Sequence, residues 1–401
     1  MSHIHNPIIP ALTGAISRGD LVQYLTPLHS QNAGDGFGVC QYIHGVTAAN
    51  GAYNGGVYSP TQNRIYLIPL TQCNISQWHY INCDTGAIVA YTHGFGSSIA
   101  SQSFSGGVYS PTQNRIYLVP YVGSTATNWY YINCNTGSVI AYAHGAAVVA
   151  NAYLGGVYSP TQNRIYFAPY AQGYSSNQWH YVDCNTGAIV AYTAAVINST
   201  YYGGCYSPTQ NRIYFVPFGM APSTSWHYIN CDTGSPVAYV HGFSASIPAN
   251  AYTGGVYSPT QNRIYFVPRV QSTNANWHYV NCDTGTIVAY AHGQTNVAAQ
   301  AYAAGCYSPL SNRIYFTPIG QGGSANWHYV DCNTGQVVSY LNGVTTLATA
   351  YAGNCIYSPT QGRVYFAPYS QGPQASWHYV QEFSPIEVPP LLMANGLFNK
   401  F

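Results

Sequence analysis

The sequence predicts an all-β fold, a seven-bladed β-propeller with four antiparallel strands in each blade. The first observation is that the tract Tyr-Ser-Pro-x-x-x-Arg-Ile/Val-Tyr occurs seven times in 401 residues, at intervals of 48 to 51 residues. A period of that size is typical of propellers and solenoids. The first tyrosines of the tracts are Tyr58, Tyr109, Tyr158, Tyr206, Tyr257, Tyr307 and Tyr357. The other two observations are four strand-like stretches in each repeat, and an N-terminal stretch that supplies a strand missing from the last repeat.

The first repeat illustrates the four expected strands. Its second stretch is rich in β-branched and aromatic residues and ends at Pro69, and a proline cannot donate a hydrogen bond inside a sheet. Polar turns, Thr61-Gln62-Asn63 and Asp84-Thr85-Gly86, separate strands one and two and strands three and four. The expected strands are Gly55–Pro60, Arg64–Pro69, Gln77–Cys83 and Ala87–Tyr91.

The two ends of the chain favour a closed ring over a solenoid. The seventh repeat has three expected strands, at Gly353–Pro359, Arg363–Pro368 and Ser376–Glu382, and no fourth. Upstream of the first repeat, Asp35–Gly45 matches the fourth-strand pattern with one residue inserted. A ring closed by this stretch leaves no exposed sheet edge, whereas a solenoid requires capping repeats. We therefore expect an N-terminal arm at residues 1–35, a propeller at 36–384 and a C-terminal tail at 385–401.

The order of motifs within a repeat resembles a known family. Tyr-Ser-Pro, a turn, Arg-Ile-Tyr-Phe, a loop, Tyr-Val-Asp-Cys-Asn-Thr-Gly and Ala-Ile-Val follow one another as in the blades of YVTN-type repeat propellers. The resemblance covers nearly the whole propeller, but the Trp-His pair and the Cys before the turn depart from that family. Such propellers serve binding, scaffolding and enzymatic roles, so the resemblance implies a fold and no active site.

Composition excludes several classes of function. Only 5% of the residues are charged, the net charge is +1, and no basic cluster is present. Nucleic-acid binding draws on concentrated Lys and Arg, so we expect no nucleic-acid partner. No apolar run approaches the length of a membrane span, so we expect no membrane insertion. The first residues lack the basic and apolar regions of a secretory signal, which predicts synthesis in a cytoplasm without a signal peptide.

The cysteines are expected to be reduced and buried. Six of the eleven occupy one repeated position, and they therefore lie a blade apart: Cys83, Cys134, Cys184, Cys231, Cys282 and Cys332. Cys205, Cys306 and Cys355 are assigned to a position where other repeats carry valine. A position that accepts Cys or Val is a small apolar core position.

The repeated His, Arg and Trp residues are interpreted as structural. Metal ligands must converge on one ion, whereas repeats spread around a ring do not, so we expect structural hydrogen bonding for the histidines and no metal. Nearly every blade carries one Arg and one acid, which suggests local pairing or turn capping, with an anion-binding ring of arginines as the alternative. The tryptophans are assigned to the core or to blade interfaces, with sugar stacking as the alternative. No nucleophile elbow, phosphate loop or carboxylate pair is present, so we expect no catalytic residues, no cofactor and no enzyme.

Sequence variation between repeats points to one face as the binding surface. The loops between strands two and three and the connectors between blades vary, and both emerge on the same face, which we call the variable face. The opposite face carries the nearly constant turns and is called the constant face. Loops on a rigid scaffold carry recognition, so the variable face is the expected ligand site. The candidate residues are Tyr121, Tyr170, Tyr174, Phe218, Arg269 and Tyr369. Sevenfold identical sites on the constant face, binding a repetitive ligand, are the alternative.

The two arms suggest assembly with other structural proteins or with copies of the same chain. Their apolar residues are candidates for docking on neighbours or for packing back on the propeller: Ile8, Ile9, Leu12, Leu391, Leu392 and Phe398. The function predicted is a non-enzymatic structural or attachment protein at the surface of a virion, a capsid or tail component, because its Tyr- and Asn-rich, weakly charged repeats resemble the propellers of viral and phage particles. The alternatives are a multivalent glycan-binding lectin, a subunit of an extracellular filament or surface layer, and an enzyme that uses the central channel.

Overall fold

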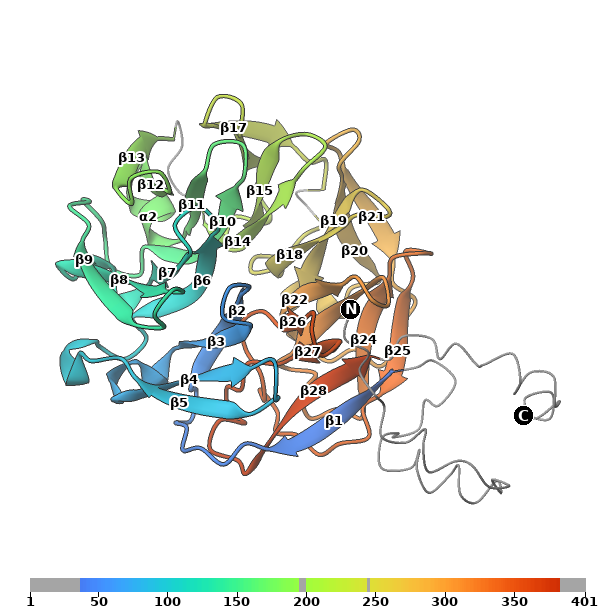
Figure 1. The fold of residues 1–401 in the computed structure, drawn as a ribbon. Coiled ribbons are helices and arrows are strands. Elements are labelled where there is room, and N and C mark those ends of the chain that lie inside the picture. The colour runs from blue at the N-terminus through green and yellow to red at the C-terminus, as the bar shows by residue number, and fades with distance from the viewer. Residues whose placement is uncertain (1–36, 195–199, 244–245, 383–401) are drawn as a thin grey trace, which may run out of the picture.

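The computed structural model describes residues 37–194, 200–243 and 246–382, which form a ring of seven four-stranded antiparallel sheets (Figure 1). Each sheet is one blade, and in blades 1 to 6 the strands follow the chain from the central channel outward. This arrangement confirms the predicted propeller. The arms, with Ile8, Ile9, Leu12, Leu391, Leu392 and Phe398, lie outside the described residues.

The strands follow the repeat closely. Blades 1 and 2 are β2 (Tyr53–Ser59), β3 (Arg64–Pro69), β4 (Gln77–Asn82) and β5 (Ile88–Thr92), then β6 (Phe104–Ser110), β7 (Arg115–Pro120), β8 (Asn128–Asn133) and β9 (Val139–Ala143). Blades 3 and 4 are β10 (Tyr153–Ser159), β11 (Arg164–Pro169), β12 (Gln178–Asp183) and β13 (Ile189–Thr193), then β14 (Tyr201–Ser207), β15 (Arg212–Pro217), β16 (Ser225–Asn230) and β17 (Ser235–Val240). Blades 5 and 6 are β18 (Tyr252–Ser258), β19 (Arg263–Pro268), β20 (Asn276–Asn281) and β21 (Ile287–Ala291), then β22 (Tyr302–Ser308), β23 (Arg313–Pro318), β24 (Asn326–Asp331) and β25 (Val337–Leu341).

Blade 7 closes the ring as expected. It consists of β26 (Ile356–Ser358), β27 (Arg363–Tyr365), β28 (Ser376–Glu382) and the N-terminal β1 (Phe37–Ile43). β1 pairs with β28 from Phe37 opposite Glu382 to Ile43 opposite Ser376. The ring therefore closes by hydrogen bonds between the two ends of the propeller, and no blade is left with three strands.

The first strand of blade 7 corrects part of the sequence interpretation. β26 and β27 are shorter than expected, because blade 7 carries one extra residue between Tyr351 and the Tyr-Ser-Pro tract. Ile356 pairs with Tyr365 as Val57 pairs with Tyr66, so Ile356 occupies the valine position. The assignment of Cys355 to that position was wrong by one residue, since Cys355 stands where other blades have glycine.

Glycines allow the innermost strands to approach one another around the channel. Gly55 in β2 has φ +86°, and a Cβ atom built there would lie 2.1 Å from Oδ1 of Asn354 in blade 7. The register between β2 and β3 shifts between Tyr53 and Gly56, which is a β-bulge. A residue with a side chain at Gly55 would meet both a strained backbone and a clash.

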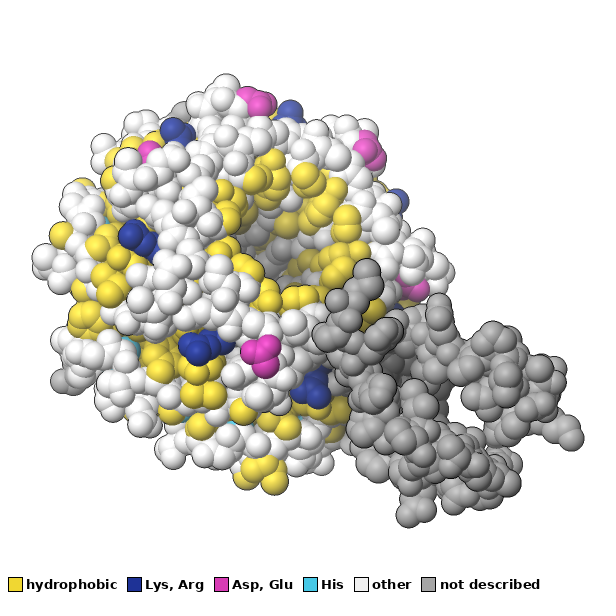
Figure 2. Space-filling view, in the orientation of Figure 1, with side chains coloured by type: hydrophobic (Ala, Val, Ile, Leu, Met, Phe, Trp, Pro, Cys, Tyr) yellow, Lys and Arg dark blue, Asp and Glu magenta, His cyan; other side chains and the backbone are white. Residues whose placement is uncertain are grey.

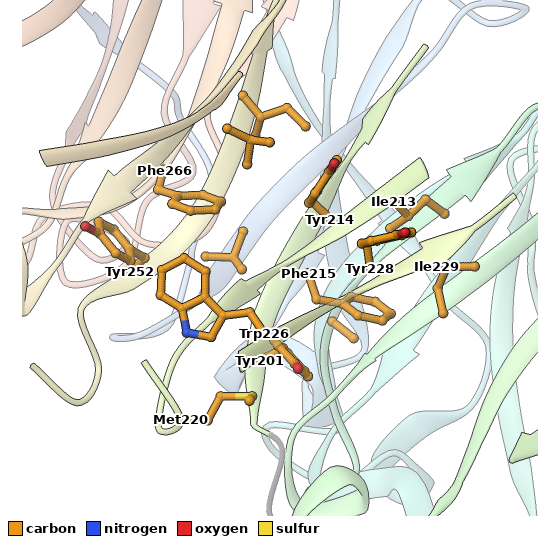
Figure 3. Packing of buried hydrophobic residues seen from close by; sticks show 14 of the residues in the cluster. Tyr201, Ile213, Tyr214, Phe215, Met220, Trp226, Tyr228, Ile229, Tyr252 and Phe266 are labelled. Carbon is orange, nitrogen blue, oxygen red and sulfur yellow. The ribbon is translucent and has the colours of Figure 1, made fainter. Parts of the chain in front are cut away.

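The core lies between neighbouring blades. Trp226 of β16 is fully buried, stacks on His241 with ring centroids 3.8 Å apart, and meets Phe266 of the next blade edge-on at 5.8 Å. Figure 3 shows Trp226 pointing from its own blade toward Phe266 and Tyr252. All seven repeat tryptophans are buried, which confirms the core and blade-interface assignment. The eleven cysteines are free thiols, and burial raises the pKa of Cys282 and Cys332 to about 11.

Short helices lie in the loops of the variable face. They are η1 (Thr71–Asn74), η2 (Gly96–Ser98), η3 (Val122–Thr125), α2 (Ala171–Ser175) and η4 (Val270–Thr273). Among the described residues, none of the helices has the length and apolar character that a membrane span requires.

Candidate functional site

One backbone position on the variable face is fixed in all seven blades while its side chain varies. It directly follows the proline that ends the second strand in blades 1 to 6, and it follows the equivalent Pro368 in blade 7. The residues at this position are Leu70, Tyr121, Tyr170, Phe218, Arg269, Ile319 and Tyr369. In each blade its backbone N–H donates to a carbonyl of the preceding connector, as in the 2.7 Å bond from Tyr121 to Ser103 and the 2.8 Å bond from Tyr170 to Ala152. The scaffold thus presents these side chains from a rigid backbone.

Three of these side chains form a continuous row of aromatic rings over blades 2 to 4. The ring centroids of Tyr121 and Tyr170 are 6.4 Å apart, and those of Tyr170 and Phe218 are 6.2 Å apart. Phe218 also meets Tyr202 of β14 at 5.5 Å. These separations lie within the range in which aromatic pairs attract.

Arg269 ends the row on blade 5. Its guanidinium carbon lies 5.8 Å from the centre of the Phe218 ring, within cation–π range. Nε and Nη2 of Arg269 both donate to Oε1 of Gln300, at 3.3 Å. Among the described residues Arg269 is the one basic side chain outside the repeat position. We call Tyr121, Tyr170, Tyr202, Phe218 and Arg269 the aromatic arc.

Tyr202 connects the aromatic arc to the central channel. It is half-buried, and its neighbours Asn54 and Ser105 belong to blades 1 and 2, on other sides of the channel. Burial raises the pKa of Tyr202, and the polar groups of Asn54 and Ser105 and the charge of Arg269 partly oppose that rise. Asn54 Nδ2 donates to Ser105 Oγ at 3.1 Å. These side chains and the glycines of the inner strands line a cavity of about 240 Å³.

The structure brings together four of the six candidate ligand residues. Tyr121, Tyr170, Phe218 and Arg269 lie in the arc. Tyr174 lies in α2, 63% exposed, and has no part in the row. Tyr369 stands at the same backbone position in blade 7, next to the connector at Gly51.

Sequence reasoning missed Tyr202. Its position directly follows the Tyr or Phe that precedes the inner-strand glycines, and the other repeats have smaller side chains there: Asn54, Ser105, Leu154, Thr253, Ala303 and Ala352. A single large residue at a position of small ones was the available signal. Its contact with Phe218 required the folded ring, because the connectors that set the spacing differ between blades.

Comparisons with known proteins identify the fold but no family. The sequence matches no protein-family model and no curated protein. Among solved structures, U3-55K aligns with a TM-score of 0.58 at 6% identity over 86% of this chain and 98% of its own. The fold is that of WD40-like propellers. A chain of the mitotic checkpoint complex aligns with a TM-score of 0.56 at 10% identity, over 86% of this chain and 91% of that one.

A third structure with a similar fold is an extracellular domain. The extracellular domain of a hybrid two-component system from B. thetaiotaomicron aligns with a TM-score of 0.56 at 13% identity, over 84% of this chain and 41% of that one. Identities this low show the fold alone. The propeller is shared, and the YVTN resemblance stays a prediction from the sequence pattern.

The first set of repeat histidines belongs to the framework that supports the arc. The hydroxyl of Tyr53 in β2 is hydrogen-bonded to Nδ1 of His79 in β4, and both side chains are buried. The same pair occurs in six blades: Tyr53–His79, Tyr153–His180, Tyr201–His227, Tyr252–His278, Tyr302–His328 and Tyr351–His378. Blade 2 replaces both members, and Phe104 meets Tyr130 with ring centroids 5.8 Å apart. Burial lowers the pKa of His79 to about 4, and the neighbouring His44 adds to that effect.

The second set of histidines fastens the connectors of the variable face. His93 Nε2–H donates to the carbonyl of Ile75 at 2.9 Å, and its Nδ1 accepts the backbone N–H of Phe95 at 3.4 Å. In blade 6 Asn342 makes the same two bonds, donating to Ser324 and accepting from Val344. An amide thus replaces the imidazole without changing the pattern, which supports the predicted structural hydrogen-bonding role of these histidines, although blade 3 has Ala194 at this position and no such clamp. Among the described residues no three His, Cys, Asp or Glu side chains gather into a metal-binding group.

The repeat arginines correct another expectation. Arg64 places its guanidinium carbon 4.3 Å from the centre of the Tyr80 ring, and the other six repeat arginines make the equivalent contact. The acids accept hydrogen bonds near the turns, as Asp84 does from Asn63 at 2.6 Å. The repeat arginines therefore contact a tyrosine ring rather than chiefly an acid. The acids lie at the turns and accept hydrogen bonds there, as the turn-capping prediction expected. A delocalised guanidinium on a flexible stem stacks well on an aromatic face, which a periodicity argument did not anticipate.

Proposed function

We propose that the protein is a binding scaffold without catalysis of its own, which attaches a protein partner through the aromatic arc of the variable face. The observation that carries this proposal is the contiguity of the arc. On a chain with 5% charged residues, one row combines three aromatic side chains in contact, a channel tyrosine and the one described arginine outside the repeat.

The composition of the arc supports a protein partner. Tyrosine and arginine are enriched among the residues that dominate binding energy at protein interfaces. Large rings on a backbone held by conserved hydrogen bonds lose little conformational entropy when a partner binds. The other blades place Leu70 and Ile319 at the same position, so the arc covers one side of the mouth rather than all of it. One asymmetric surface on a sevenfold scaffold is suited to one partner in one orientation.

The test uses full-length protein as bait in extracts of the cells in which it is made. The variant Tyr170→Ala with Phe218→Ala removes the middle of the arc, and Tyr174→Ala, on the same face but outside the row, is the matched control. A partner retained by the wild type and the control should be retained at least tenfold less by the arc variant. Equal retention by all three proteins, or no specific partner of the wild type, contradicts the proposal. Thermal melting checks that the variants fold.

Glycan binding is the second candidate, because aromatic rings flanked by amide and hydroxyl groups also stack on sugars. Arg269 with Gln300 and Asn54 with Ser105 supply such groups beside the rings. A glycan array probed with wild type and the arc variant separates the two candidates. Wild-type binding that disappears in the variant identifies a lectin and contradicts a protein partner at this surface.

We extend the proposal to the place where the protein is found. The few charges, the many tyrosines and asparagines, and near-identical blades support a component of a virion or other particle surface, made in the cytoplasm and assembled with structural proteins or copies of itself. Mass spectrometry and immunogold labelling of purified particles test this. Labelling confined to soluble cell fractions contradicts it.

A further inference from the structure

The channel opens on the constant face through a funnel lined by inner-strand residues of six blades. Figure 2 shows hydrophobic side chains around the hollow at the middle of this face. We call the funnel the constant-face vestibule. Its volume is about 460 Å³, within the about 300–1,000 Å³ typical of ligand sites. Its side chains include Val57, Tyr58, Val108, Tyr109, Val157, Tyr158, Cys205, Tyr206, Cys306, Tyr307, Ile356 and Tyr357, and none of the lining residues is charged.

Five of the six tyrosine hydroxyls that line the vestibule donate to an asparagine of their own blade, whereas Tyr357 has Gly362 at the asparagine position. Tyr58 donates to Oδ1 of Asn63 at 3.0 Å, and Tyr109 donates to Oδ1 of Asn114 at 2.9 Å. Four further blades repeat this bond. What the vestibule offers is therefore the rings of the tyrosines and the methyl and thiol groups above them. An apolar, uncharged segment matches that lining, and an acidic or basic peptide does not.

We propose that the C-terminal segment of the same chain, residues 385–401, binds in the constant-face vestibule. This inference concerns the face opposite the aromatic arc and does not rest on the proposed function.

The place where the described chain ends supports this occupant. The Glu382 carboxylate accepts hydrogen bonds from the hydroxyls of Ser308 and Ser311 in blade 6. Ser308 directly follows Tyr307, a lining residue of the vestibule. The segment therefore starts beside the rim, so tethering gives it a high effective concentration at the vestibule.

The sequence of the segment matches the vestibule. Residues 388–399 contain no charged side chain. Leu391 is 9 residues beyond Glu382, which corresponds to about 30 Å of extended chain. Pro389 and Pro390 favour an extended backbone before the segment binds. Consecutive side chains of an extended chain point to opposite sides, so Leu391 and Leu392 can contact facing walls of the ring.

The N-terminal arm is the weaker candidate. It also starts at this edge, since Phe37 pairs with Glu382. Its apolar run, Ile8 to Leu12, lies 25 residues before Phe37. Effective concentration falls with about the −3/2 power of linker length, so the shorter C-terminal linker has the advantage.

The experiment uses the full chain with a photo-cross-linking residue in the segment, Leu392→p-benzoylphenylalanine, followed by irradiation and peptide mapping. We expect cross-links within one chain to peptides that contain Val108, Tyr109 or Tyr307. The matched control is Ile9→p-benzoylphenylalanine in the N-terminal arm, which should give at least fivefold fewer cross-links to those peptides.

A second variant keeps the proposal open to contradiction if the first label disturbs binding. With the label at Phe398, the added change Leu391→Asp should reduce cross-links to the vestibule at least fivefold, and melting should not change. Three results overturn the proposal: cross-links that miss the vestibule, a covalent dimer that shows exchange with a second copy, or a vestibule signal that Leu391→Asp leaves unchanged.

Discussion

The two halves of each blade are held together by different chemistry. Toward the variable face, imidazoles join the strands, as in the Tyr53–His79 pair and the His93 clamp. Toward the constant face, amides and hydroxyls make the links. For example, the Thr61 hydroxyl of blade 1 donates to Oδ1 of Asn114 in blade 2 at 2.9 Å. An imidazole has an ordinary pKa of about 6.5, whereas amides and hydroxyls do not take up protons in the mildly acidic range. The halves that look equally regular in the sequence should therefore respond differently to acid.

Acidification should have the largest effect and should act on the imidazole half. Burial lowers the pKa of five histidines to about 4: His79, His180, His278, His328 and His378. Between that value and the unfolded value of about 6.5, the unfolded chain binds more protons than the folded chain. Stability is therefore complete above about pH 6.5 and is lost as the pH falls toward 4. The loss is on the order of 3 kcal/mol for each buried imidazole, against about 5–15 kcal/mol for a whole domain.

Thermal melting from pH 7.5 to pH 4 measures this effect, and we expect the melting temperature to fall steeply below pH 6.5. Hydrogen exchange by blade sharpens the comparison, because blade 2 has Tyr130 in place of the histidine and should lose protection last. A melting temperature that is constant down to pH 4 would show that the imidazoles do not hold the variable-face half together.

The next effect concerns the one junction at which the constant face departs from its pattern. In blade 7 Glu382 replaces the repeated cysteine, and its buried carboxylate accepts from Ser308 and Ser311. Glu382→Ala should lower the free energy of unfolding by about 2–3 kcal/mol, because two hydrogen bonds to a carboxylate are lost and the buried hydroxyl of Ser308 is left unpaired.

Urea unfolding at pH 7.5 tests this, with Glu382→Cys as the matched control that restores the residue of the other blades. The control should lose less stability than the alanine variant. The idea of a specific carboxylate site fails if both variants lose under 0.5 kcal/mol.

How much of this organisation the sequence predicts depends on the distance between partners. The strand Arg64–Pro69 was predicted with its observed bounds, because prolines and β-branched residues act locally. The Tyr53–His79 pair was not foreseen, since its members lie 26 residues apart and only the joint change to Phe104 and Tyr130 signals their contact. Four residues of the aromatic arc were foreseen singly, but Tyr202 was missed and the row was not predicted, because its spacing depends on ring closure.

Blade 2 offers the third and smaller test, the conversion of its exceptional pair into the common one. Tyr130→His alone places an imidazole opposite Phe104, which cannot supply a hydroxyl. Phe104→Tyr alone buries a hydroxyl without the imidazole. Each single variant should lose about 1–2 kcal/mol, and the double variant should recover about 1 kcal/mol as a coupling energy. Urea unfolding of the four proteins gives the cycle, and additive losses would show that the two positions do not interact.

The smallest expected effect concerns the junction of the constant face that lacks the repeated Thr–Asn hydrogen bond. Thr–Asn bonds join six of the seven junctions, and the bond from Thr209 to Asn262 measures 3.0 Å. Between blades 6 and 7, Leu310 faces Gly362 instead, and a Cβ atom at Gly362 would lie 3.1 Å from the Leu310 Cδ2 atom.

Replacing both residues, Leu310→Thr with Gly362→Asn, should therefore add the missing bond. Gly362 has φ +58°, and the equivalent Asn63 and Asn262 have φ +49° and +51°, so asparagine fits this backbone. The gain should be about 0.5–1.5 kcal/mol, and Thr209→Val, at a junction that has the bond, should lose a similar amount. Gly362→Asn alone should be destabilising, because Leu310 still occupies the space. If the double variant is no more stable than the wild type while Thr209→Val is less stable, the departure at this junction is fixed by Glu382 rather than by the Thr–Asn position.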